Sequence, residues 1–476
     1  MPSLTSVKYT NKKIRKYAII GGIVLGVVLV LSLGIYFLMR SGVFYKKKDT
    51  AASVFKMSAE MSQVEMESDL RKGYMFSRTT KTLMEDRKTD PWVLSWYVIP
   101  GTTRSVPAME SAFVDSLDQV LLLESYVLEG KRSKAETLIK AIDESLVDGS
   151  GLLLAFRRAD ELISPDSRTK EEMCDLYENP AYLKLETSPV SMAATTRYLR
   201  ALMNYYDKWG DAKLLERIES LTKTIFDAGY VASYRSADQL ARPTPIPVTE
   251  KSLITPEPQG EKTGNNKTGE NIGDEGEDTD SDEKEETLVS LEGIELSSLD
   301  FDALRRACVL MPEYQSKYED LIRIVEEGKI SEELPLYAWL YNDAGYMYYT
   351  GSEGNADLVS SLYVMVHLAE IGRLDPDSYA WISQQIYNTG FLYTSYNIMS
   401  GEAASDVEAY EAYPLVLYLA QIKGDDNLFK TTFQAMMRKY ATLDTSPVIY
   451  MFFRNVENSR VAVYARENLL VEIHLR

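Results

Sequence analysis

An uncharged and mostly apolar run of 23 residues occupies positions 17–39 (YAIIGGIVLGVVLVLSLGIYFLM). As a helix it would extend about 34 Å at ~1.5 Å per residue, which is enough to cross a bilayer with some tilt. The run is longer than the apolar core of about 7–15 residues in a secretory signal peptide, and no clean A-x-A cleavage site follows it. The pattern therefore predicts a single transmembrane helix.

Basic residues flank this run on both sides, five before it and four between positions 40 and 48. The positive-inside rule is therefore nearly balanced. We expect the short head, residues 1–16, to lie in the cytoplasm and a juxtamembrane linker, residues 40–56, to lead into a domain outside the cell. Gly22 and Gly26 have the spacing of a helix-dimerisation motif, but such a spacing is common by chance in glycine-rich spans.

Beyond the linker, apolar residues recur with the period of amphipathic helices and lack the strict alternation of strands. Short connections containing Gly130 or Gly372 separate some of these segments, and glycine is a frequent helix stop. Paired helices with short connections predict an all-α stack or toroid, although no repeat is strict enough for a known solenoid. The predicted helices span residues 111–129, 133–146, 191–208, 212–228, 358–371, 376–387, 409–421 and 428–440.

Residues 243–290 break the helical pattern. Five prolines open the segment, the run GDEGEDTDSDEKEE lies near its end, and apolar residues are few. This composition predicts a disordered, solvated loop. The acidic run lacks the D-x-[DN]-x-[DN]-G spacing of an EF-hand calcium loop. Because helices resume on both sides, we interpret the segment as an insertion into one domain, residues 57–476.

Composition excludes several classes of protein. The chain has 52 Lys and Arg against 71 Asp and Glu, a formal net charge of -19, which does not suit a nucleic-acid binder. Two cysteines, Cys174 and Cys308, do not make a disulfide scaffold or a cysteine zinc site; a bridge between them and two buried thiols both stay open. Two histidines argue against a His-rich metal centre and a Ser-His-Asp triad. No GxGxxG or GxxxxGK[ST] motif is present, so we expect neither a metal nor a cofactor.

Acid–base chemistry therefore falls to Asp and Glu, and the other unusual feature of the chain is its aromatic content. There are 32 tyrosines and 5 tryptophans. Aromatic rings with a flat apolar face and a polar edge suit carbohydrate stacking, but the same rings can equally fill a helical core. Two clusters stand out, one made of Tyr337, Trp339, Tyr341, Tyr346, Tyr348 and Tyr349 and the other of Tyr387, Phe391, Tyr393 and Tyr396.

Three short stretches match the patterns of one enzyme family. Residues 58–66 (SAEMSQVEM) are similar to Ser-Glu-x-x-Gly-x-x-Met, residues 112–117 (AFVDSL) to Ala-Thr-x-Asp-Asp-Leu, and residues 299–305 (LDFDALR) to Tyr-x-x-Asp-Ala-Ile-Arg. Residues 95–97 (SWY) also resemble a tryptophan-containing strand that precedes the second pattern. On these stretches the chain resembles glycoside hydrolase family 8, and it is nearest to the family's membrane- or surface-attached bacterial branch, which often accompanies exopolysaccharide synthesis.

The resemblance implies an (α/α)6 toroid, preceded here by the transmembrane helix, that hydrolyses β-linked polysaccharides with inversion. It assigns Glu60 as general acid, Asp302 as general base with Arg305 as its basic partner, and Asp115 as a substrate-binding carboxylate. Inverting hydrolysis needs its two carboxyl groups about 6.5–9.5 Å apart. Trp96, together with Tyr337 and Trp339 of the first aromatic cluster, is expected to bind substrate.

Alternatives to these assignments stay open. Glu65 and Glu67 compete with Glu60 for the role of acid, and Asp300 competes with Asp302 for the role of base. Burial among apolar neighbours would keep the acid protonated near neutral pH. An aspartate at position 302 is also what a helix N-cap or first turn favours.

Two functions of different class follow. The first is a membrane-anchored extracellular glycosidase, at the cell membrane of a Gram-positive bacterium, whose partners are a polysaccharide and the bilayer. The alternative is a non-catalytic glycan-binding or accessory subunit of a membrane polysaccharide synthase complex. Retention of Glu60 and Asp302 favours the enzyme. Gln63 in place of the family's glycine and Ser116 in place of its second acid favour the accessory protein.

Overall fold

The computed structural model describes residues 84–85, 89–99, 109–163, 173–174, 188–227, 231–236, 288–348, 354–443, 446, 448–456 and 460–475. The predicted head, transmembrane run and linker (residues 1–56) and Glu60 lie outside these residues, as does most of the acidic insert. Among the residues that are described, no helix combines the length and the apolar character needed to cross a membrane.

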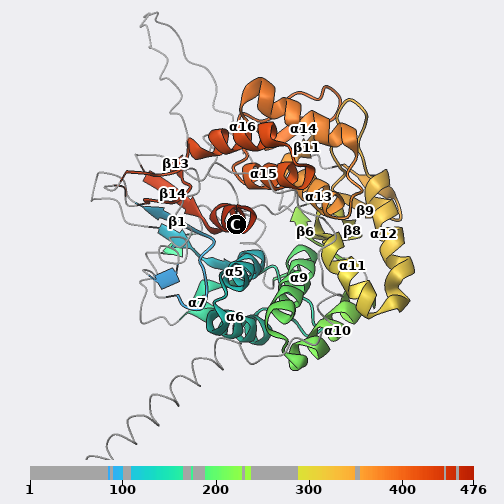
Figure 1. Cartoon of the computed structure of the whole chain (residues 1–476), viewed down its shortest axis with the longest axis vertical. Coiled ribbons are helices and arrows are strands. Elements are labelled where there is room, and N and C mark those ends of the chain that lie inside the picture. Colours follow the sequence, from blue (N-terminus) through green and yellow to red (C-terminus); the bar gives the residue numbers. More distant parts are fainter. Residues whose placement is uncertain are drawn as a thin grey trace, which may run out of the picture.

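Six helices in the described part of the chain form a closed inner ring (Figure 1). Each contacts the next in chain order, and the last packs back against the first. This is the inner layer that an (α/α)6 toroid requires, and the predicted fold is confirmed at that level. The inner helices are α5 (Ser116–Glu129), α9 (Met192–Trp209), α11 (Phe301–Leu310), α13 (Leu358–Glu370), α15 (Ala412–Lys423) and α17 (Ala465–His474).

Outer helices alternate with the inner ones along the sequence and lie around the ring (Figure 1). Because each outer helix returns the chain to the end where the next inner helix begins, the inner helices all start at the same end of the ring. The outer helices within the described residues are α6 (Arg132–Ser145), α10 (Ala212–Asp227), α12 (Gln315–Glu327), α14 (Pro376–Thr389) and α16 (Asp426–Met437).

The two layers differ in how much of each helix is buried. All thirteen residues of α13 (LVSSLYVMVHLAE) are buried, whereas α6 buries only Ala135, Leu138 and Ile142. A helix surrounded by others is apolar on every side, while one at the surface needs an apolar stripe with a spacing of three to four residues. The sequence therefore encodes the layer as well as the helix.

Local capping explains where the helices begin and end. Asp115, Asp300 and Asp357 accept hydrogen bonds from backbone N–H groups in the first turns of α5, α11 and α13, which satisfies donors that a helix leaves unpaired at its start. Gly130 ends α5 in the left-handed conformation, with φ at 73°, which glycine adopts without strain. The predicted helix boundaries hold within about three residues, except that residues 111–115, predicted as helix, are mostly strand.

Short strands occupy most connections from an outer to an inner helix, which the all-α prediction did not include. The largest sheet has five strands in the order β13-β14-β1-β2-β5, in which β1 (Trp96–Ile99) pairs antiparallel with β14 (Arg460–Tyr464). Most of these strands have two to five residues, which is too short to show an alternating pattern, so they could not be predicted from the sequence. The other strands are β2 (Met109–Ser111), β3 (Phe113–Asp115), β4 (Phe156–Arg158), β5 (Met173–Cys174), β6 (Val231–Ser236), β7 (Leu288–Glu292), β8 (Ile294–Glu295), β9 (Leu340–Asn342), β10 (Gly345–Met347), β11 (Asn355–Asp357), β12 (Ser395–Asn397) and β13 (Arg454–Val456).

The ends of the predicted insert are joined by a strand pair. β6 and β7 run antiparallel, with Ser236 opposite Leu288, so residues 237–287 leave and rejoin the domain at one place. The last three residues of the predicted loop, 288–290, belong to β7, because the apolar run LVSL pairs with β6. Cys308 on α11 is a free, buried thiol, so the structure does not support a bridge to Cys174.

Candidate active site

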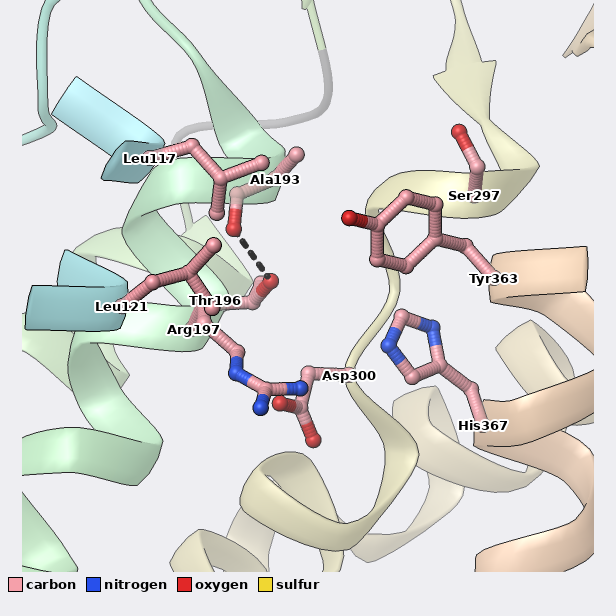
Figure 2. Close-up of a pocket in the computed structure, with 9 residues that line it drawn as sticks. All are labelled: Leu117, Leu121, Ala193, Thr196, Arg197, Ser297, Asp300, Tyr363 and His367. Carbon is pink, nitrogen blue, oxygen red and sulfur yellow. Dashed lines mark hydrogen bonds between the residues drawn. The ribbon is translucent and has the colours of Figure 1, made fainter. Parts of the chain in front are cut away.

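A small cavity lies inside the ring, toward the end where the inner helices begin (Figure 2). Its volume of ≈ 10 Å³ is room for about one water molecule and not for a sugar ring. It is lined by Leu117 and Leu121 of α5, by Ala193, Thr196 and Arg197 of α9, by Ser297 and Asp300 at the start of α11, and by Tyr363 and His367 of α13. The cavity therefore joins four of the inner helices.

Asp300 is the carboxylate on the cavity wall. Its oxygens accept two hydrogen bonds of 2.5 Å from the guanidinium of Arg200, and Oδ1 also accepts the N–H of Ala303 at 3.0 Å. Burial acts to raise the pKa of Asp300, but the Arg200 guanidinium outweighs it and holds that pKa below its usual range. Asp300 is therefore ionised at neutral pH, as a general base must be.

Arg200 also holds a second carboxyl group, that of Glu370 at the end of α13. Nη1 of Arg200 donates to Oε1 of Glu370 at 2.5 Å, and the hydroxyl of Tyr418 donates to the same oxygen at 2.9 Å. Complete burial raises the pKa of Glu370 in spite of Arg200. One buried cation thus compensates two buried acids. The pKa of Asp300 is lowered and that of Glu370 is raised.

A second carboxyl pair begins α5. Nη2 of Arg466 lies 2.7 Å from Oδ1 of Asp115, and Nε of Arg466 donates to Oδ1 of Asp118 at 2.9 Å. Burial, helped by the nearby Asp115, raises the pKa of Asp118 to about 7 against the opposing effect of Arg466. A carboxyl group that is about half protonated at neutral pH suits a proton donor.

Of the two residues predicted as the catalytic pair, the structure describes one. Glu60 lies outside the described residues. Asp302 is fully buried in the first turn of α11 and pairs with Nη1 of Arg306 at 3.2 Å and Nη2 of Arg305 at 3.5 Å. The predicted proximity of Asp302 and Arg305 is present, but the cavity wall carries Asp300, two residues earlier.

The aromatic residues expected to bind substrate are buried instead. Trp96 in β1, Tyr337 and Trp339 are each exposed by 3% or less. Nε1 of Trp339 donates to Glu295 at 3.3 Å, and the backbone N–H of Tyr337 donates to Ser361 at 3.0 Å. Because these rings pack between secondary-structure elements, their role here is to fill the core. Trp96 does lie in a strand ahead of the second motif, as predicted.

The arginines that compensate the buried acids were not predicted from the sequence. Besides Arg200 and Arg466, Arg197 donates to Glu124 at 2.7 Å inside the ring. The only signal was their position in apolar helices, as in MAATTRYLRALM, where a charge demands a buried partner. Within the described residues, no group of three His, Cys, Asp or Glu side chains is arranged to hold a metal ion.

Comparison with known proteins places the fold. No family profile and no curated protein sequence matches the chain. Among solved structures, an alpha-amylase from Clostridium perfringens has 18% identity, a TM-score of 0.53, and an alignment covering 76% of this chain and 85% of that one. PssZ from Listeria monocytogenes has 10% identity, a TM-score of 0.50, and coverage of 87% and 97%.

A further similar structure is endoglucanase Cel10, a family 8 glycosyl hydrolase from Klebsiella pneumoniae, with 12% identity, a TM-score of 0.45, and coverage of 84% of this chain and 97% of that one. At such identities the likeness concerns the fold and not the chemistry. The toroid of alternating inner and outer helices that the sequence predicts is present, and the first two of these structures are similar to it in fold.

Proposed function

We propose that this chain is a glycoside hydrolase that cleaves a β-linked polysaccharide by an inverting, two-carboxylate mechanism. The observation that carries the proposal is a carboxylate, Asp300, on the wall of a cavity with room for about one water. Arg200 holds the pKa of Asp300 below its usual range in spite of burial, so this carboxylate is ionised at neutral pH. An ionised carboxylate beside a site for one water is what the general base of an inverting glycosidase requires.

In this mechanism one carboxyl group protonates the glycosidic oxygen as the C–O bond breaks. A carboxylate on the other side takes a proton from the water that attacks the sugar carbon. Glu60 is the proposed acid, on the strength of its sequence motif. Asp300 is the proposed base, because it is ionised and borders a cavity with room for about one water. Asp302 matches the family motif better and remains the rival base.

We also propose that residues 17–39 anchor the protein in the cell membrane with the toroid outside. The length and apolar character of that run support the anchor. The proposed substrate is a polysaccharide of the cell surface, and a membrane synthase that makes it is the proposed partner. The linkage rests on the family resemblance alone, so starch belongs in any substrate panel because the Clostridium perfringens neighbour is an alpha-amylase.

The test is reducing-end release by the full chain, purified in a mild detergent, on hydroxyethyl cellulose, xylan and soluble starch. Glu60→Gln and Asp300→Asn should each lower the rate by roughly 10²–10⁴-fold. Asparagine is as good an N-cap as aspartate, so α11 should keep its start. Glu65→Gln is the matched control and should stay within a few-fold of the unmutated rate.

Other patterns of activity among the variants would assign the acid and the base differently. Loss of activity in Asp302→Asn but not in Asp300→Asn assigns the base to the motif aspartate. Loss at Glu65 and not at Glu60 shifts the acid by about one helical turn. Absence of hydrolysis on all three polysaccharides, with binding retained, refutes the enzyme and leaves the non-catalytic glycan-binding protein.

A further inference from the structure

A second and much larger hollow lies away from the ring centre. We call it the rim groove, and its lining residues come from four segments: Phe391 and Tyr393; Asp406, Val407, Glu408 and Tyr410; Arg438 and Lys439; and Arg454 and Asn455. The first two segments connect α14 to α15, and the last two connect α16 to α17. All four are outer-to-inner connections, so the rim groove lies at the same end of the ring as the central cavity.

The rim groove has the size of a ligand site. Its volume is ≈ 500 Å³, which falls within the range of about 300–1,000 Å³ found for small-molecule pockets. The central cavity, at ≈ 10 Å³, does not hold a sugar unit. The groove therefore has room for a glycan segment without rearrangement, which the central cavity lacks.

Aromatic rings and polar side chains together line the groove. Phe391 is 39% exposed, and the guanidinium of Arg438 lies 4.2 Å from its ring centroid. The guanidinium of Arg454 lies 4.9 Å from the centroid of Tyr410. Flat rings beside planar donors offer both a stacking face and hydrogen-bond partners for sugar hydroxyls.

The charges that line the groove are largely balanced. Arg454 pairs with the buried Glu467 behind it. Arg438 pairs with Glu408 at 3.4 Å. The hydroxyl of Tyr413 also donates to Glu408.

Two further charged residues line the groove, the cation Lys439 and the anion Asp406. When Glu467 behind the wall is counted, three cations face three anions, so the groove has no excess of positive charge. The whole chain carries a net charge of -19, which repels acidic polymers at long range.

We infer that the rim groove binds an uncharged stretch of polysaccharide, with a sugar stacked on the exposed face of Phe391 and its hydroxyls bonded to Arg438, Asp406 and neighbouring polar groups. A chain held there lies at the end of the ring that carries Asp300. The inference rests on the proposed function only in that the ligand is a glycan. It concerns binding and requires no turnover.

The test is native electrophoresis of the full chain, in mild detergent, through gels containing one polysaccharide each. The neutral polymers are hydroxyethyl cellulose, xylan and soluble starch, and carboxymethyl cellulose is the anionic counterpart of the first. Phe391→Ala should weaken retardation by roughly three- to tenfold in apparent affinity, the range expected for loss of one aromatic stacking contact. Tyr387→Ala is the matched control, because Tyr387 is an exposed aromatic (49%) one turn away that does not line the groove.

Retardation by a neutral polymer that weakens in Phe391→Ala and not in Tyr387→Ala supports the inference. Equal retardation of the two variants overturns it, as does stronger retardation by carboxymethyl cellulose than by every neutral polymer. Lack of retardation by all three neutral polymers overturns it as well. Hydrolysis is scored separately, so an inactive protein that is still retarded through Phe391 refutes the proposed enzyme and leaves the groove in place.

Discussion

The central cavity and the rim groove lie at the same end of the ring, yet the charged side chains around them differ in burial and pairing. Around the cavity, Arg200 is 5% exposed and compensates two acids that are buried almost completely. In the groove, Arg438 is 42% exposed and pairs loosely with Glu408. The first arrangement fixes carboxyl groups at defined protonation states and leaves space for about one water. The second leaves space for a ligand.

The difference follows from where the chain places each region. Inner helices are enclosed on every side, so an ionisable side chain on them must pair with an opposite charge or become neutral. The groove is built from connections that face solvent, where an ion pair contributes little and a side chain is free to contact a ligand. We therefore expect changes in the cavity region to alter stability and chemistry, and changes in the groove to alter binding.

The largest effect is expected for Arg200→Met. The substitution keeps an unbranched side chain but leaves Asp300 and Glu370 buried without their cation. Removing one partner of a buried ion pair typically costs about 3–5 kcal/mol. Urea unfolding should show a loss of this size in the free energy of unfolding. A loss below about 1 kcal/mol would mean that the charges around the cavity are solvated.

Asp118→Asn should change how stability depends on pH. The pKa of Asp118 is raised from 3.8 to about 7 on folding, so the folded chain binds a proton that the unfolded chain releases. The stabilisation linked to that proton is fully present below about pH 4 and is lost as pH rises through about 7.

The free energy of unfolding of Asp118→Asn, measured relative to the unmutated chain, should therefore increase between pH 4 and 7, by up to roughly 4 kcal/mol. Urea unfolding at several pH values measures it. A difference that stays constant over that interval would show that Asp118 is ionised throughout, which would contradict its raised pKa.

The smallest effect on stability is expected for Arg438→Ala in the groove. Its pairing with Glu408 is exposed, although the guanidinium also donates to the carbonyl of Gly390 at 2.7 Å. The free energy of unfolding should fall by less than about 1 kcal/mol. Thermal unfolding followed by circular dichroism checks this, and a loss comparable to that of Arg200→Met would erase the contrast between the two regions.

The sequence predicted one of these regions better than the other. Helical periodicity located the inner and outer helices from α5 to α10 and from α13 to α16, because burial on one or all sides leaves a readable pattern. It did not locate α11, α12 or α17, which lie outside the predicted helical segments. Phe391 and Tyr393 of the second aromatic cluster line the rim groove, whereas Tyr337 and Trp339 of the first are buried in the core.

The cavity was harder to predict because its geometry depends on single residues. Asp300 and Asp302 are two positions apart at the start of α11, and only the structure shows which of them faces the cavity. Arg200 meets Asp300 across 100 positions of sequence. No local pattern encodes such a contact, so sequence motifs could not predict that these two residues pair.

The most direct test of a division of labour between the two regions is the behaviour of Asp300→Asn. A single preparation of the full chain is assayed for reducing-end release and for retardation by the same neutral polysaccharide. We predict that turnover falls by roughly 10²–10⁴-fold while retardation matches that of the unmutated chain. Hydrolysis at the unmutated rate would contradict this account, as would loss of retardation in a variant that remains folded.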